Sequence, residues 1–220
     1  MAERFTRTTQ NRMGAIPCGF ESHLAHMNRN LLAYMIGVAI GDGNLSNPNG
    51  RATRLRITCD AEYPKLAEKI KNSIKSLLPN NKVSVIYRHK NYFDISCYSN
   101  RWEEILRWHV GKGSKIAQNV SIPNWINGKA TYKINCLRGL LETDGSIYND
   151  RGYRMVMFTT AIPKLARDVY DIIKSLGFTS HIYKIDRKNN SYNFKQKPIY
   201  HIRVSKNVER FLNLIKPEKI

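Results

Sequence analysis

The sequence has no long apolar run, few cysteines and few acidic residues. Its longest apolar run, near residues 31–41, is too short to cross a bilayer, which excludes a membrane-spanning protein. The four cysteines, Cys18, Cys59, Cys97 and Cys136, are spread too widely for a zinc or redox motif, so we expect a reducing compartment. Residues 1–28 lack the apolar core of a signal peptide. We therefore expect an intracellular protein, in a prokaryotic cytoplasm or an organelle (chloroplast or mitochondrion), and not a secreted one.

The shortage of acids leaves a large positive charge. Lys and Arg number 36 against 17 Asp and Glu, a formal net charge of +19. Because so much charge repels itself in a folded domain, we expect a polyanionic partner. Nucleic acid is favoured, since phosphate contacts release counterions and drive binding. An anionic membrane is the weaker alternative, because no segment has the pattern of a basic amphipathic surface helix.

The sequence repeats itself in two halves. "AYMIGVAIGDGNL" (33–45) and "CLRGLLETDGSIY" (136–148) are both apolar, glycine-bearing helix patterns that end in Asp-Gly. Each half then reads helix, two strands, helix, two strands, helix, with the second helix amphipathic and starting at Pro64 or Pro163. Such self-similarity predicts an α+β protein of two pseudo-symmetric αββαββα lobes.

The positions of Gly and Pro residues predict where the lobes begin and end. We expect a flexible basic arm at 1–28, for which an organelle-targeting role stays open. An N-terminal lobe at 29–118 is followed by a linker rich in Gly and Pro signals at 119–131 and a C-terminal lobe at 132–220. The Asn-rich segment 186–197 is interpreted as a hairpin tip inside the second lobe.

Two acids end the repeated helices. Gly37, Gly41 and Gly139 form small-residue stripes that allow the two helices to pack closely, which places Asp42 and Asp144 at adjacent C-termini. Negative charge there opposes the helix dipole, so its presence indicates a function. A single Asp-Gly is more simply a helix stop. Two of them at matching positions favour the functional interpretation.

The segments "MIGVAIGDG" (35–43) and "LRGLLETDG" (137–145) resemble the two motifs of the single-chain LAGLIDADG homing endonucleases. The resemblance covers residues 29–220 and implies motif helices at the lobe interface and saddle-shaped antiparallel sheets in the DNA major groove. It also implies metal binding by Asp42 and Asp144, with Gly41 and Thr143 beside them. The family's other motif acid is Glu142 in one copy and Ile40 in the other, and it is not the essential ligand.

The resemblance implies an activity and its cofactor. We expect a monomer, a pseudo-dimer by symmetry, that makes a double-strand break in a long asymmetric DNA target, with intron homing as its setting. Two or three Mg²⁺ ions would serve, with Mn²⁺ as a substitute and Ca²⁺ supporting binding without cleavage. Oxygen ligands suit these hard cations, and metal-activated water supplies the nucleophile.

A basic residue beside each acid is a further implication. Lys112 and Lys219 occupy matching places after the closing helices and are expected to be catalytic, with Lys115 and Lys216 as substitutes. The family's pocket position just after the first strand corresponds to Cys59-Asp60 and Thr160-Ala161, which depart from its Gln or Lys.

Base recognition is expected from polar strand faces, where Arg addresses guanine and Asn or Gln adenine, although most such contacts in DNA complexes go to phosphates. The candidates are Arg54, Arg56, Thr58, Arg88, His89, Tyr92, Tyr98, Arg154, Lys184, Arg187, His201 and Arg203. His23 and His26 lack the partners of a zinc site.

Three alternatives use the same scaffold. An intron RNA maturase, which would bind its own intron RNA, is compatible with both acids. A non-cleaving DNA-binding regulator has no need of Asp42 and Asp144. An intein fragment is disfavoured, because residue 1 is not Cys or Ser and the chain ends in "KPEKI".

Overall fold

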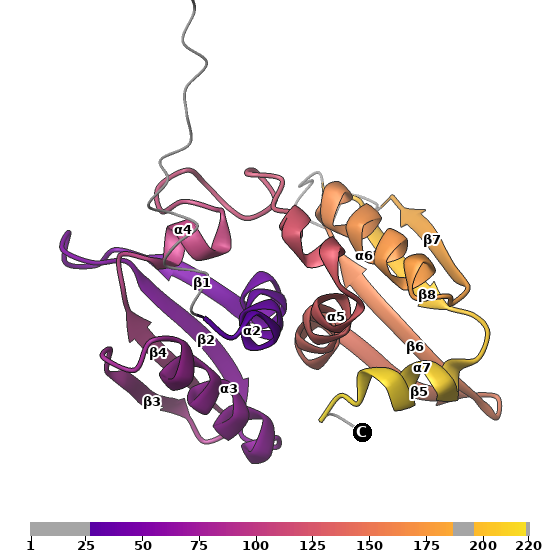
Figure 1. Cartoon of the computed structure of the whole chain (residues 1–220), viewed down its shortest axis with the longest axis horizontal. Coiled ribbons are helices and arrows are strands. Elements are labelled where there is room, and N and C mark those ends of the chain that lie inside the picture. The colour runs from indigo at the N-terminus through magenta and orange to yellow at the C-terminus, as the bar shows by residue number, and fades with distance from the viewer. Residues whose placement is uncertain (1–26, 187–195, 219–220) are drawn as a thin grey trace, which may run out of the picture.

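The structure is a computed structural model that describes residues 27–186 and 196–218. Two lobes, each with one four-stranded antiparallel sheet, lie on either side of a central pair of helices, α2 and α5 (Figure 1). Within these described residues, no helix is long and apolar enough to cross a membrane. The predicted α+β fold of two αββαββα lobes is confirmed, while the lobe boundaries stay a prediction.

The first lobe has its sheet in the order β1-β2-β4-β3. Its elements are α2 (Arg29–Asp42), β1 (Gly43–Ser46), β2 (Arg54–Asp60), α3 (Pro64–Leu77), β3 (Val83–His89), β4 (Tyr92–Tyr98) and α4 (Trp102–Leu106). The side chain of Asn28 caps the N-terminus of α2 by accepting the amide hydrogens of Asn30 and Leu31. The helix ends at Asp42, and the extended backbone of Gly43 starts β1.

The second lobe repeats this arrangement, with its sheet in the order β5-β6-β8-β7. Its elements are α5 (Ala130–Asp144), β5 (Gly145–Asp150), β6 (Tyr153–Thr160), α6 (Pro163–Ser175), β7 (Ser180–Ile185), β8 (Ile199–Val204) and α7 (Val208–Ile215). A short 3₁₀ helix, η1 (Asn124–Gly128), precedes α5. The Asn-rich segment lies between β7 and β8, and its residues 187–195 are outside the described residues.

Alternation along the strands separates a core face from a polar face. In β2, Leu55, Ile57 and Cys59 are buried, whereas the residues between them are less buried or exposed. The antiparallel register places Ile95 and Cys97 of β4 opposite Ile57 and Leu55, so both strands send their apolar side chains to the same face. The polar side chains of β2 therefore lie on the opposite face of this sheet.

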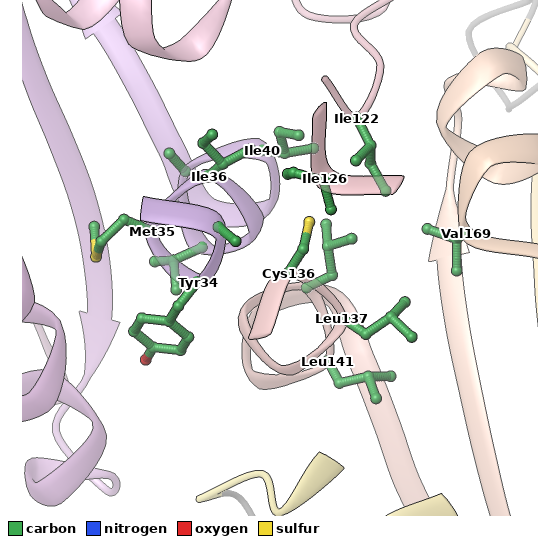
Figure 2. Close-up of a cluster of buried hydrophobic side chains, with 14 of the residues drawn as sticks. Tyr34, Met35, Ile36, Ile40, Ile122, Ile126, Cys136, Leu137, Leu141 and Val169 are labelled. Carbon is green, nitrogen blue, oxygen red and sulfur yellow. The ribbon is translucent and has the colours of Figure 1, made fainter. Parts of the chain in front are cut away.

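The two central helices touch through backbone. A Cβ added at Gly37 would lie 2.2 Å from the carbonyl oxygen of Cys136, and one at Gly139 would lie 2.4 Å from that of Tyr34. Only glycine permits this approach. Figure 2 shows the apolar side chains around the crossing, with Ile122 and Ile126 on the side of Cys136, and Leu137 and Leu141 pointing into the second lobe.

Candidate active site at the helix crossing

The crossing brings the two motif acids to one place. Asp42 and Asp144 are the last residues of α2 and α5, and each is followed by a glycine that starts a strand. The residues just before them face each other, because a Cβ on Gly41 would lie 2.0 Å from Oγ1 of Thr143. The Thr143 hydroxyl lies 3.0 Å from the carbonyl oxygens of both Gly139 and Leu140, within donor distance of its own helix. The two helix ends that carry the acids therefore lie side by side.

Each acid opens into a pocket on its own lobe. The first pocket, of about 340 Å³, contains Asp42, Thr143 of the opposite motif, and the end of β2 at Cys59 and Asp60. Asn91 and Tyr92 also line it. The pseudo-symmetric arrangement places the predicted pocket residues Cys59 and Asp60 beside an acid.

The second pocket, of about 600 Å³, repeats this pattern with the motifs exchanged. It contains Asp144, Gly41 of the opposite motif, and Thr160 and Ala161 at the end of β6. Two lysines, Lys115 and Lys197, also line it, whereas the described residues that line the first pocket include no Lys or Arg. The two pockets are therefore related in geometry but unlike in charge.

Lys115 is the basic residue that the structure places at the acids. Its Nζ donates to the carbonyl oxygens of Ile40, at 2.5 Å, and of Gly41 at the end of α2. Burial lowers the pKa of this ammonium group, while the carboxylates of Asp144 and Asp42 act in the opposite direction. A cation at these carbonyls also complements the helix dipole.

The geometry favours Lys115 over the predicted Lys112, whose side chain is exposed three residues earlier in the loop after α4. Lys216 is exposed at the C-cap of α7 and lines a different cavity, with Asn149 and Arg154. Lys219 lies outside the described residues. Among the described residues, Lys115 and Lys197 therefore line the Asp144 pocket, and no lysine lines the Asp42 pocket.

The donor set suits a hard divalent cation. Among the described residues no three His, Cys, Asp or Glu side chains gather, so a closed protein cage of the zinc type is not formed there. Mg²⁺ instead binds through one or two carboxylates and completes its shell with waters and substrate phosphates. The Lys115 ammonium held by main-chain oxygens shows that this end of α2 already attracts positive charge. The carboxylate oxygens of Asp42 and Asp144 fit a cation of this kind.

Glu142, the other motif acid, lies in a buried network between the lobes. Its Oε2 accepts the hydroxyl hydrogen of Tyr34 at 2.7 Å, and its Oε1 accepts from Lys69 Nζ and from the Glu218 amide, both at 2.9 Å. Burial, followed by the charge of Glu142, raises the pKa of Tyr34 far above its usual range. Glu142 thereby ties α5 to α2, α3 and the C-terminal segment. Sequence reasoning missed this role because all its partners are distant along the chain.

The polar face of the first sheet collects most of the DNA-contact candidates on that lobe. Arg54, Arg56 and Thr58 alternate with the buried residues of β2, and Tyr98 and Tyr92 of β4 lie opposite Arg54 and Asp60. Arg88 reaches the same face from β3, where it contacts Asp94. His89 is the last residue of β3. The alternation of polar and buried residues along β2 is confirmed, and contact of this face with DNA stays a prediction.

The DNA-contact candidates of the second sheet lie on two different faces. His201 and Arg203 share a face with Met157 and Thr159, and the Thr159 hydroxyl lies 2.9 Å from Nδ1 of His201. Arg154 and Lys184 instead follow the register of the buried residues, and Arg154 lines a cavity with α7. Those two side chains start from the core-facing side of the sheet, whereas Arg187 lies outside the described residues.

Sequence reasoning overlooked other members of this second polar face. Tyr148, His181 and Tyr183 follow the alternation of His201 and Arg203 and are exposed. The exposed tyrosines and histidine give this face a different character from the arginine-bearing first sheet. Strand alternation could have found them once the register was known.

Comparisons with known proteins agree with this architecture. Residues 131–216 match the family model of the LAGLIDADG-like domain, and residues 31–107 match that of the WhiA LAGLIDADG-like domain. A crystal structure of I-DmoI in complex with DNA and Mn aligns at a TM-score of 0.60 and 16% identity, covering 85% of this chain and 96% of that one. The N-terminal LAGLIDADG domain of DUF199/WhiA aligns at 0.56 and 13% identity, covering 90% of each chain.

Two sequence relatives match only in part of their length. The chain is 31% identical over 177 residues to the ATP-dependent DNA helicase Hel308 of Thermococcus kodakarensis, which is 79% of this chain and 15% of the helicase. It is 24% identical over 214 residues to the tRNA-splicing ligase RtcB of Methanopyrus kandleri, which is 84% of this chain and 20% of the ligase. The chain thus spans a fifth or less of these relatives.

Proposed function

Because this chain is built from two LAGLIDADG-like domains, we propose that it is a homing endonuclease that makes a double-strand break in a long asymmetric DNA target. The observation that carries the proposal is the pair of acids at the helix crossing, each facing its own pocket. A protein that only binds DNA gains nothing from two carboxylates held where they oppose both the helix dipoles and the phosphates.

Binding begins with the charge of the chain. The excess of +19 and the two polar sheet faces supply phosphate contacts and base contacts along a duplex. One chain carries the two sheets that would bind the two halves of the target, so we propose that it acts as a monomer inside the cell. Because the two polar faces differ in residues, the two halves of the target differ in sequence.

Cleavage takes place at the crossing. Asp42 and Asp144 would hold divalent metal, which when bound activates a water and stabilises the leaving oxygen. Each acid would act on one DNA strand, a proposal supported by the two separate pockets that Asp42 and Asp144 line. Lys115 contacts the carbonyl end of α2 and would add positive charge beside a DNA phosphate bound in the Asp144 pocket.

Substitution of the acids tests the proposal. A duplex pool is first selected for binding in Ca²⁺ and then moved to Mg²⁺, and both strands are mapped on a denaturing gel. Asp42→Asn and Asp144→Asn should each slow double-strand cleavage on the order of 10²-fold or more, the loss usual when one stabiliser of transition-state charge is removed. Binding in Ca²⁺ should change little, because the groove contacts remain.

A matched control separates this effect from general charge. Asp171→Asn removes an exposed acid on α6 that pairs with Arg167 at 3.0 Å, away from the crossing. It should cut at the wild-type rate. Full activity of either single acid variant would remove the metal assignment.

A second candidate is a non-cleaving DNA-binding protein on the same scaffold. It is favoured by one observation, the match of residues 31–107 to a domain model named for WhiA. The same experiment distinguishes the two functions, because tight sequence-selective binding without any cut in Mg²⁺ or Mn²⁺ would support the second.

A further inference from the structure

A buried carboxylate lies on the polar face of the first sheet. Asp94 occupies the middle of β4, opposite Thr58 of β2, and exposes only 3% of its surface. An aspartate is rarely buried unless it is paired. A negative charge on a surface that meets DNA also repels the phosphates. Its position on this face therefore calls for a specific role.

The Asp94 carboxylate contacts side chains from both neighbouring strands. Its Oδ1 accepts the Thr58 hydroxyl hydrogen at 2.9 Å, and its Oδ2 accepts Nε–H of Arg88 at 2.9 Å. Nη1 of Arg56 lies 3.9 Å from the same Oδ2. Because β4 lies between β2 and β3, one carboxylate engages an arginine from each neighbouring strand.

We propose that Asp94 is a positioning residue for base specificity, which aims Arg88 and Arg56 at guanines in the half-site read by the first sheet. This inference rests on the proposed DNA-binding function. A guanidinium carries five N–H donors in a rigid fork, and the Arg88 bond to Asp94 uses Nε–H. Its Nη donors lie at the outer end, where they suit O6 and N7 of guanine.

The exposure of the two arginine side chains, and their restraint by Asp94, agree with this role. The side chains of Arg88 and Arg56 are 44% and 35% exposed, so both reach the surface although the acid between them does not. An arginine already fixed by a buried acid has less rotamer freedom to lose on binding. It also has a preferred direction, which favours one base over others.

The described strands of the second sheet lack an equivalent of the Asp94 contacts. At the corresponding register, Thr159 lies opposite His201, and Met157 takes the place of Arg56. The Thr159 hydroxyl lies 2.9 Å from the His201 ring nitrogen instead of contacting an acid. The guanine preference that depends on Asp94 should therefore appear in one half of the target only.

The test compares base preferences selected from a random duplex pool in Ca²⁺. Wild-type protein should select a site with guanines in one half. Asp94→Asn should reduce the preference for those guanines by about 10-fold, the scale of one good bidentate contact. Its affinity for random-sequence duplex should stay equal or rise, because a negative charge has been removed. Asp171→Asn, which alters an acid–arginine pair on α6, should leave the preference unchanged.

Two further variants keep the test independent of folding. Arg88→Lys retains the charge of an exposed side chain but loses the fork, so it should lose guanine preference while keeping most of its affinity. Asp94→Asn added to Arg88→Ala should change little further at the base that Arg88 reads.

Three results would overturn the inference. Unchanged preferences in Asp94→Asn would show that the arginines need no support, and an equal change at every base would make Asp94 a bulk charge. If wild-type protein selects no sequence at all, the proposed function fails together with the inference. That outcome is recognisable because no preference exists to be lost.

Discussion

Replacement of Gly139 by alanine should push α5 away from α2 and destabilise the protein. The added Cβ would lie 2.4 Å from the Tyr34 carbonyl oxygen and 2.7 Å from the Val38 nitrogen, whereas ordinary contact begins at 3.4 Å. The helices must therefore move apart by about 1 Å, from 3.4 minus 2.4. Both obstructing atoms belong to backbone, so no flexible side chain can give way.

The size of the effect follows from two opposing contributions. Overpacking of a close interface costs typically 1–3 kcal/mol and sometimes more, and this rigid site should reach the upper end. Alanine is better than glycine in a helix by about 1 kcal/mol. The net loss should be roughly 2 kcal/mol, which lowers the melting temperature of a protein of this size by about 4–8 °C.

Urea and thermal unfolding of Gly139→Ala measure this loss. Gly128→Ala is the matched control, because its Cβ meets nothing within 4 Å and its backbone is not left-handed. Cleavage should fall as well, since the same displacement moves Asp144 away from Asp42. A Gly139→Ala protein as stable as wild type would refute the close backbone packing of α2 against α5.

Two further predictions concern the buried groups beside the crossing. Tyr34→Phe removes a hydrogen bond to the buried Glu142 carboxylate and should lower the free energy of unfolding by about 1.5–3 kcal/mol in urea titrations; an unchanged value would contradict the network. Burial lowers the pKa of Lys115 below its ordinary 10.5, so between the two values the unfolded chain binds more protons than the native one. Stability should therefore rise with pH relative to Lys115→Met, and a difference between these two proteins that is constant from pH 7 to pH 10 would exclude this linkage.

Local sequence patterns were sufficient to predict much of the fold. The repeated apolar helices, the prolines that open α3 and α6, and the alternation in β2 and β4 all depend on near neighbours in the chain. These patterns predicted the order of helices and strands in both lobes, which the structure confirms. The glycine stripe with its terminal acids also pointed to the crossing, since small residues and a carboxylate at a helix end are visible without coordinates.

Residues in segments without such periodicity were harder to assign. Lys112 and Lys115 lie in one irregular loop, and only the folded path shows that Lys115 reaches the carbonyls of α2. In β6, Met155 and Met157 on one face and Val156 and Phe158 on the other are all apolar. The strand pattern therefore did not indicate which face Arg154 occupies.

The charges with distant partners depended wholly on tertiary structure. Glu142 reads as a motif acid, yet its side chain is satisfied by Tyr34, Lys69 and Glu218 from three separate parts of the chain. Asp94 reads as one polar position among several, but sheet register makes it the acid between two arginines. Periodicity determines which residues turn inward, because it reflects backbone geometry. Strand register and helix packing decide which charges meet, because those pairs are joined only through space.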